Sequence, residues 1–122
     1  MGLLDPFRRF AARMGQSDED RLREEISSWA SKVPGTVRIE QARSRERARL
    51  AGVVRRITVR PAEGSEALEA LITDGTGEVR VVWMGRRSIP GLTLGTKLVV
   101  EGLVAEQRGE RRLVNPRFEF ST

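Results

Sequence analysis

Arginine dominates the side chains of this sequence that could do chemistry. Twenty of the 22 basic residues are arginines, and the other two are Lys32 and Lys97. A guanidinium group is planar, stays charged at physiological pH and donates paired hydrogen bonds to phosphates or base edges. The 122-residue chain carries a formal net charge of +5. These features favour a polyanionic partner, although codon bias in a GC-rich genome would also explain the preference for arginine over lysine.

The residue types that most enzymes use for catalysis are missing. The chain has no cysteine, histidine or tyrosine, which removes thiolate nucleophiles, disulfides, the commonest general base and the usual zinc ligands. The acids Asp18, Glu19 and Asp20 stand where a helix is expected to begin, and Asp74 stands in a turn, so each has a structural explanation. The sequence therefore predicts a non-enzymatic protein with no metal or other cofactor.

The first unit expected to position these side chains covers residues 1–35. Apolar residues between Leu3 and Met14 recur at helical spacing with arginines between them. Because two turns are too short to be stable alone, we expect a loose arm or a contact with a protein partner, ahead of a membrane surface. A second helix begins near Ser17 and ends before Pro34. Its apolar face consists of Leu22, Ile26, Trp29 and Val33.

A second unit, residues 36–122, has the pattern of strands. A short lead-in strand is expected at residues 36–39. Turn signals rich in glycine and proline separate the apolar stretches that follow. Arg43, Arg45, Arg47 and Arg49 alternate in the approach to the first of these stretches. The five expected strands cover residues 48–60, 67–73, 78–84, 96–106 and 112–120.

Strict alternation assigns the faces of these strands. Leu68 and Ile72 share one face of the second strand, and Val79 and Trp83 share one face of the third, so both pairs are expected to point inward. Regular alternation in the first strand would bury a charge, so we expect a bulge near residues 55–56. Five strands with tight hairpins predict a mainly β chain folded as a small closed or nearly closed barrel.

Several motifs follow one another in a fixed order. Asp74–Gly77 reads D-G-T-G, Val79–Trp83 reads V-R-V-V-W, Val100–Gly102 reads V-E-G, and Asn115 is followed by a proline. In this order and spacing, residues 47–120 resemble OB-fold domains of the anticodon-binding-like group, which includes the RecG helicase wedge domain and small bacterial single-OB proteins. The resemblance implies a five-stranded OB-fold barrel after an N-terminal helical segment. Since no helix fits between residues 84 and 95, the helix that carries Trp29 is expected to close the open end.

The resemblance also implies where a ligand would bind. Single-stranded DNA or RNA would cross strands two and three, between the loops that join strands one and two and strands four and five. Arginines there would neutralise phosphates, although charges on exposed strands also resist aggregation. Two aromatic residues could stack on bases, but alternation turns one of them, Trp83, inward. The expected contact residues are Arg55, Arg56, Arg60, Thr73, Arg80, Val82, Trp83, Arg86, Arg87, Arg108, Arg111, Arg112 and Phe118.

A second hypothesis is a protein-interaction module that binds no nucleic acid. Its contact surface would combine the outward apolar residues Leu71, Val82 and Val99 with the arm between Leu3 and Met14. The chain also lacks an apolar run of the roughly 18 residues that a membrane-spanning helix needs. No signal-peptide pattern stands at its start. A cytoplasmic location is therefore expected.

Overall fold

The computed structural model describes residues 16–62 and 64–121, and within them the chain is mainly β. One α-helix and one short 3-10 helix precede a single sheet of seven strands. The elements are α2 (Gln16–Ser31), η2 (Ile39–Gln41), β1 (Arg47–Ala62), β2 (Ser65–Thr73), β3 (Glu78–Met84), β4 (Lys97–Leu103), β5 (Ala105–Gln107), β6 (Glu110–Val114) and β7 (Arg117–Phe120).

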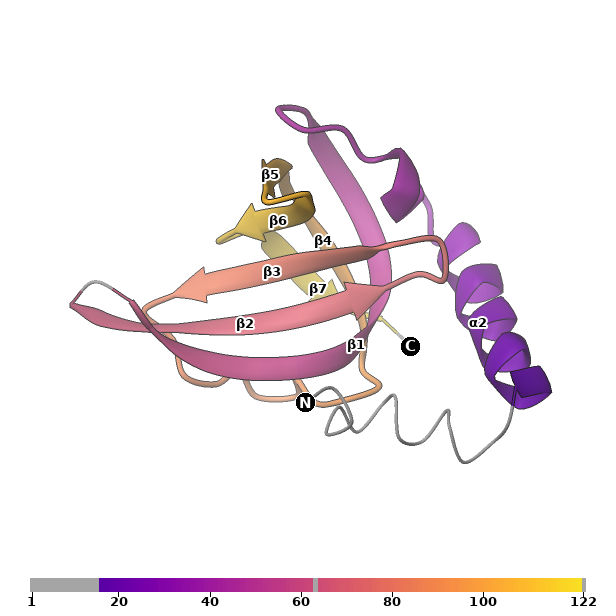
Figure 1. Ribbon diagram of the computed structural model, residues 1–122, viewed down its shortest axis with the longest axis horizontal. Helices are drawn as coiled ribbons and strands as arrows, with labels where there is room; N and C mark the ends of the chain where they lie inside the picture. The colour runs from indigo at the N-terminus through magenta and orange to yellow at the C-terminus, as the bar shows by residue number, and fades with distance from the viewer. Residues whose placement is uncertain (1–15, 63, 122) are drawn as a thin grey trace.

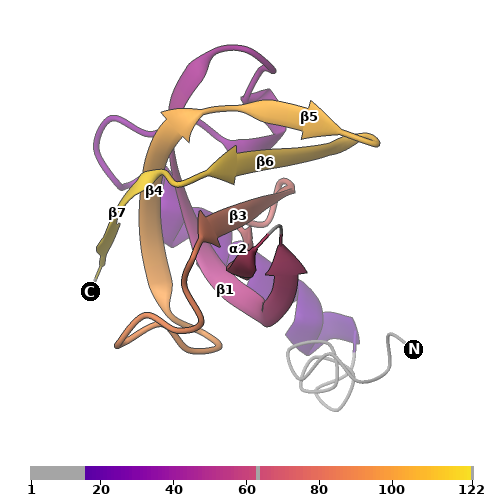
Figure 2. The ribbon, with the colours of Figure 1, turned by 90° about the vertical axis from the view of Figure 1, so that its left-hand side faces the viewer.

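The sheet curls into a half-barrel, as Figures 1 and 2 show from two directions. Its strand order is β5-β6-β3-β2-β1-β4-β7. The pairing of β3 with β6 is parallel, and the other pairings are antiparallel. Only Val104 lies between β4 and β5, although β4 pairs with β1 and β5 pairs with β6. One continuous stretch of chain therefore pairs first with β1 and then with β6, which are separated by β2 and β3 in the strand order.

The prediction of five strands was wrong in number, because the fourth and fifth expected strands each divide in two. The fourth divides at Val104, whose N–H donates to the carbonyl of Glu46 and whose carbonyl accepts from the N–H of Arg45. The fifth divides at Asn115, which has a φ of +51°, and at Pro116, which has no N–H to donate. The first interruption therefore depends on hydrogen bonds to a distant segment of the chain, and the second on the backbone of Asn115 and Pro116 themselves.

The predicted bulge in β1 is confirmed. The register between β1 and β2 shifts between Val54 and Arg56. Val54 is fully buried, and Ile57 also packs against the core. The extra residue changes the phase of the strand, so both apolar side chains reach the core while Arg56 remains exposed.

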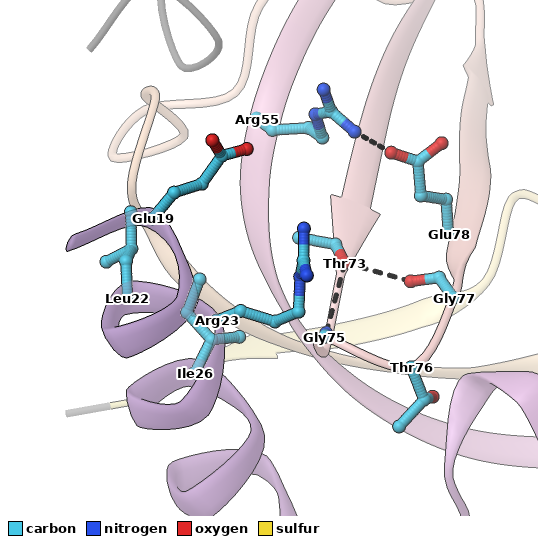
Figure 3. Close-up of a pocket in the computed structure, with 10 residues that line it drawn as sticks. All are labelled: Glu19, Leu22, Arg23, Ile26, Arg55, Thr73, Gly75, Thr76, Gly77 and Glu78. Carbon is cyan, nitrogen blue, oxygen red and sulfur yellow. Dashed lines mark hydrogen bonds and ion pairs between the residues drawn. The ribbon is translucent and has the colours of Figure 1, made fainter. Parts of the chain in front are cut away.

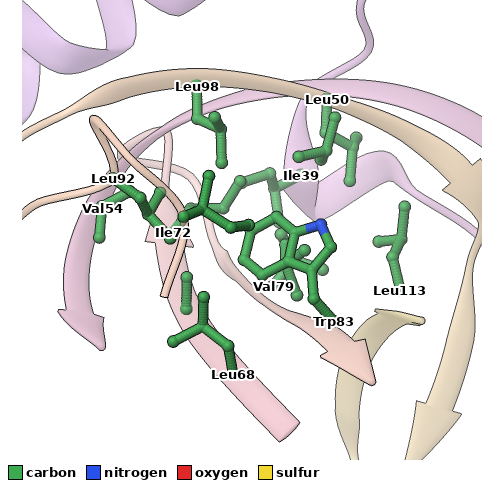
Figure 4. Packing of buried hydrophobic residues seen from close by; sticks show 14 of the residues in the cluster. Ile39, Leu50, Val54, Leu68, Ile72, Val79, Trp83, Leu92, Leu98 and Leu113 are labelled. Carbon is green, nitrogen blue, oxygen red and sulfur yellow. The ribbon is translucent and has the colours of Figure 1, made fainter. Parts of the chain in front are cut away.

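The inner face of the curled sheet holds the main hydrophobic core, shown in Figure 4. The predicted inward residues of β2 and β3 are confirmed, because Leu68, Ile72 and Val79 are almost fully buried there. Loop residues Ile89 and Leu92, between β3 and β4, extend the core. Burying these apolar side chains together provides the main driving force that holds the sheet curled.

The segment before β1 contributes to the core in a way that differs from the expectation. Residues 36–38 form no strand, and Ile39, the first residue of η2, is fully buried in the main core together with Ala42. Helix α2 packs instead on the outer face of the sheet, where Ala30 meets Ala51 and Val99. Figure 1 shows α2 beside β1. The short 3-10 turn, and not the helix that carries Trp29, therefore inserts into the core.

Gly52 in β1 allows a close approach between β1 and β2. A Cβ atom at this position would lie 3.1 Å from two side-chain carbons of Ile72 and 3.1 Å from the carbonyl oxygen of Thr73. Gly52→Val is therefore expected to lower the free energy of unfolding by about 1–3 kcal/mol. Urea unfolding followed by circular dichroism measures this change. Ala105→Val, on the exposed strand β5, is the matched control, and an equal loss in both variants would contradict the steric explanation.

Candidate nucleic-acid interface

Strand register brings three arginines into one row on the outer face of the sheet. Arg56 in β1 pairs with Leu71 in β2, Leu71 pairs with Arg80 in β3, and Arg80 pairs with Arg112 in β6. Residues directly opposite each other in a sheet point to the same face. Since Ile72, the neighbour of Leu71, is buried in the core, the row faces away from it. Arg56, Arg80 and Arg112 are called the arginine row below.

An open groove of about 440 Å³ includes two members of this row. Arg60 lies in β1 near its end and Arg108 lies in the β5–β6 turn, so one further arginine stands on each side of the groove. Arginines outnumber carboxylates four to two along its walls. The groove is lined by Arg60, Glu69, Arg80, Gln107, Arg108, Glu110 and Arg112.

Three of the four arginines that line the groove are held by acceptors within it. Arg80 donates to Glu69 at 2.9 Å and to Glu110 at 3.0 Å, and the Nε of Arg60 lies 3.1 Å from the same oxygen of Glu69. The hydrogen bond to Glu69 raises the pKa of the Arg80 guanidinium above its ordinary value, burial lowers it, and Glu110 raises it further. Arg112 donates to the side-chain oxygen of Gln107. A phosphate that binds here must compete with these carboxylates.

Arg108 differs from the other arginines of the groove. It is exposed, adopts a φ of +54° in the β5–β6 turn, and makes no ion pair with the residues that the structure describes. Its charge is therefore available to an anion without competition from a carboxylate.

Two residues predicted to contact nucleic acid lie at a different place, where α2 meets the β2–β3 turn (Figure 3). Arg55 forms an ion pair with Glu78. The hydroxyl of Thr73 donates to the carbonyl of Gly77 at 2.9 Å and accepts from the N–H of Gly75 at 3.1 Å. These contacts shape the turn, so neither residue joins the groove.

Three further predicted arginines lie outside the lining of the groove. Arg111 donates to the backbone carbonyls of Glu40 at 2.9 Å and Ala42 at 3.1 Å, which fastens the η2 segment to β6. Arg86 and Arg87 are exposed in the loop after β3, and Arg87 lies 3.1 Å from a carboxylate oxygen of Glu66. Arg111 therefore has a structural role, while the other two present charge next to one end of β3.

The apolar and aromatic residues predicted to contact bases are covered. Trp83 is only 4% exposed and lies in the main core, where its ring meets the edge of Phe118 at 5.4 Å between centroids. Phe118 is half-buried against that core, and Val82 is 2% exposed. Trp83 and Val82 are therefore not available to contact bases in this structure, and Phe118 is partly covered by its packing against the core.

Trp83→Phe is expected to leave the affinity for a single-stranded oligonucleotide unchanged. The variant removes a buried indole nitrogen that has no hydrogen-bond partner among the described residues, and it is expected to cost about 1–2 kcal/mol of stability through the cavity it leaves. Fluorescence anisotropy with a labelled oligonucleotide measures the affinity. A clear loss of affinity in the folded variant would instead place Trp83 in contact with bases, although the loss would be smaller than the roughly 1–3 kcal/mol of an alanine substitution because phenylalanine still stacks.

The surface expected for a protein-interaction module is also largely covered. Val82 is buried, Val99 lies beneath α2, and Leu71 is half-buried within the arginine row. The arm between Leu3 and Met14, the other part of that hypothesis, lies outside the described residues. The described part of the sheet therefore does not present the predicted apolar contact surface.

The groove contains two carboxylates that the sequence-based site did not include. Glu69 and Glu110 hold Arg80 from both sides. By alternation Glu69 shares the outer face of the second strand with Leu71, whose partner on the third strand is Arg80, so Glu69 is the diagonal neighbour of Arg80. Opposite charges on neighbouring strands pair readily, so this signal was present in the sequence, whereas the approach of Glu110 depends on the parallel pairing of β3 with β6.

Within residues 16–62 and 64–121, no group of three or more acidic side chains is arranged to hold a metal ion. No helix in this part of the chain is long and apolar enough to span a membrane. In comparisons with known proteins, the chain matched no protein-family model and no curated protein.

Proposed function

We propose that this chain is an OB-fold protein that binds single-stranded nucleic acid along the groove, without catalysing a reaction. The observation that carries the proposal is the arginine row, which crosses four adjacent strands and continues into an open groove with arginines on both rims. Guanidinium groups spaced along such a surface suit a flexible chain of phosphates.

The sheet topology supports the OB-fold part of the proposal. With β4 and β5 counted as one interrupted strand and β6 as the fifth, the first strand pairs with the second and fourth, and the third pairs in parallel with the fifth. OB-folds bind oligonucleotides on the face of strands two and three, between the loop after strand one and the loop after strand four. The groove occupies that location, with Arg60 and Arg108 on its two sides.

The chemistry of the groove favours backbone contact over base reading. Its lining offers guanidinium donors and no aromatic face, so phosphate neutralisation supplies the affinity and the preference for sequence is weak. A single strand is favoured over a duplex, because an unpaired chain can bend to follow the curved outer face. The absence of stacking in the groove implies a modest affinity.

Fluorescence anisotropy with labelled oligonucleotides tests this function. A single-stranded DNA, a single-stranded RNA and a DNA duplex of equal length are each titrated at two salt concentrations. With about four phosphate contacts, we expect single-strand binding to weaken roughly 50-fold as salt rises from about 50 to about 200 mM. Binding that favours the duplex, or no binding to any of the three at low salt, would contradict the proposal.

A further inference from the structure

A second group of arginines lies outside the groove and is not neutralised in the same way. Arg43, Arg45 and Arg47 take alternate positions in the segment 43–47, which leads into β1, and all three are exposed. None of them forms an ion pair with another residue in the described ranges 16–62 and 64–121, whereas Arg60 and Arg80 in the groove are both paired. Like Arg108, these three arginines carry positive charge that no ion pair within those ranges neutralises, although Glu46 lies between two of them in the sequence.

The backbone of the segment 43–47 is fixed to the sheet. The N–H of Arg45 donates to the carbonyl of Val104 at 2.8 Å, and the N–H of Val104 donates to the carbonyl of Glu46 at 2.9 Å. Arg45 itself adopts a φ of +73°. These two hydrogen bonds order the segment before any ligand binds. Binding therefore costs less conformational entropy than it would if the segment had to be ordered by the ligand.

The segment also lies next to the groove. Val104, its hydrogen-bond partner, directly precedes β5, and Ala105 in β5 pairs with Arg112 of the arginine row. Neighbouring strands are about 4.8 Å apart, so β5 is all that separates the segment 43–47 from the wall of the groove. Figures 1 and 2 both show the chain that leads into β1 passing beside β5.

We propose that the segment 43–47 is a second phosphate-binding surface, which takes the continuation of a single strand that leaves the groove across β5. This inference rests on the proposed function and names its ligand more closely, as a single strand long enough to span the groove and the segment. Because no carboxylate among the described residues holds these arginines, a phosphate can bind them without displacing one of those residues, and each contact releases counterions. The segment therefore adds affinity and salt dependence but no base preference.

The test compares a short single-stranded oligonucleotide of about 6 nucleotides, near the lower end of the usual site size of an OB-fold, with a long one of about 20, which exceeds that site size. The segment variant carries Arg43→Gln, Arg45→Asn and Arg47→Gln, with asparagine at position 45 because it tolerates a positive φ. We expect this variant to bind the long oligonucleotide about 10-fold more weakly, with its salt slope reduced by about 2. Its affinity for the short oligonucleotide is expected to stay unchanged.

A control variant of equal charge change carries Arg21→Gln, Arg23→Gln and Lys32→Gln, all exposed residues on or just after α2. Thermal unfolding of all variants confirms that each is folded. Unchanged binding of the long oligonucleotide by the segment variant, equal losses for both lengths, or an equal loss in the control variant would overturn the inference while leaving the groove intact. If the wild-type chain binds neither oligonucleotide, the proposed function fails and the inference fails with it.

Discussion

Replacing the arginine row with Arg56→Gln, Arg80→Gln and Arg112→Gln is expected to weaken binding of a single-stranded oligonucleotide roughly 100-fold at low salt. The three guanidinium groups lie in one row across β1, β3 and β6. Each loses about 1 kcal/mol of phosphate interaction, a value reduced because Arg80 must first release Glu69 and Glu110. Anisotropy titration at several salt concentrations measures both the affinity and its salt slope, which is expected to fall by about 2.

The control variant carries Arg21→Gln, Arg23→Gln and Lys32→Gln and removes the same charge from α2 and the residue that follows it. It is expected to retain most of the affinity, because none of these three side chains lines the groove. Equal losses in the row variant and the control variant would show that net charge, and not the groove, determines binding. Thermal unfolding is needed alongside, because Arg80→Gln leaves Glu110 without this partner.

Asp74→Ala is expected to destabilise the chain by about 3–5 kcal/mol, the largest effect of any substitution considered. Asp74 is 1% exposed. Its carboxylate accepts hydrogen bonds from the N–H of Ile39 at 2.8 Å, from the N–H and hydroxyl of Thr76 at 2.8 and 2.7 Å, and from the N–H of Gly77 at 3.3 Å. Alanine would leave these donors, including the buried N–H of Ile39, without this acceptor.

The same carboxylate also links the helix to the sheet. The Nε of Arg38 lies 3.9 Å from it, and the guanidinium of Arg38 donates to the backbone carbonyl and the hydroxyl of Ser27 in α2. Gly75 follows directly, where a Cβ atom would lie 3.0 Å from the carbonyl oxygen of Arg23. Loss of Asp74 is therefore expected to loosen the η2 segment and α2 together.

Differential scanning calorimetry measures the effect of Asp74→Ala, for which we expect Tm to fall by roughly 10–20 °C. Asp20→Ala removes the same charge from an exposed position on α2 and is expected to change the stability by no more than about 0.5 kcal/mol. A similar Tm for the Asp74→Ala variant and the wild-type chain would show that the hydrogen bonds of this carboxylate contribute little.

The local alternation of apolar and polar residues was sufficient to predict most of the sheet. The third expected strand has the bounds of β3, the inward faces of β2 and β3 were correct, and the phase conflict in β1 located its bulge. Each of these features follows from alternation along a few neighbouring residues, which the sequence displays directly. The division at Val104 was missed, because its cause is hydrogen bonding with Arg45 and Glu46, far away in the sequence.

The place of the helix and the composition of the groove were harder to predict. Nothing in the sequence near Ile39 shows that this residue inserts into the core and does not belong to a short strand. The backbone of Ile39 is held by a hydrogen bond to Asp74, which lies 35 positions later. Four of the arginines expected in the site line one groove, but the expected site also included Arg111 and Thr73, which bond to backbone groups instead. An arginine is available to a ligand only where no carboxylate or carbonyl of a neighbouring segment already holds it. Which segments are neighbours depends on the tertiary pairing of the strands.

Nuclear magnetic resonance of the labelled chain, titrated with a single-stranded oligonucleotide, tests the central proposal most directly. The backbone amides of β2 and β3 and the side-chain Nε–H signals of Arg56, Arg80 and Arg112 report on the groove itself. If single-stranded nucleic acid binds along the groove, we expect these signals to shift together during the titration, while the chemical shifts of the α2 residues remain unchanged. Shifts confined to α2 and β7, or a spectrum unchanged by excess oligonucleotide, would contradict it.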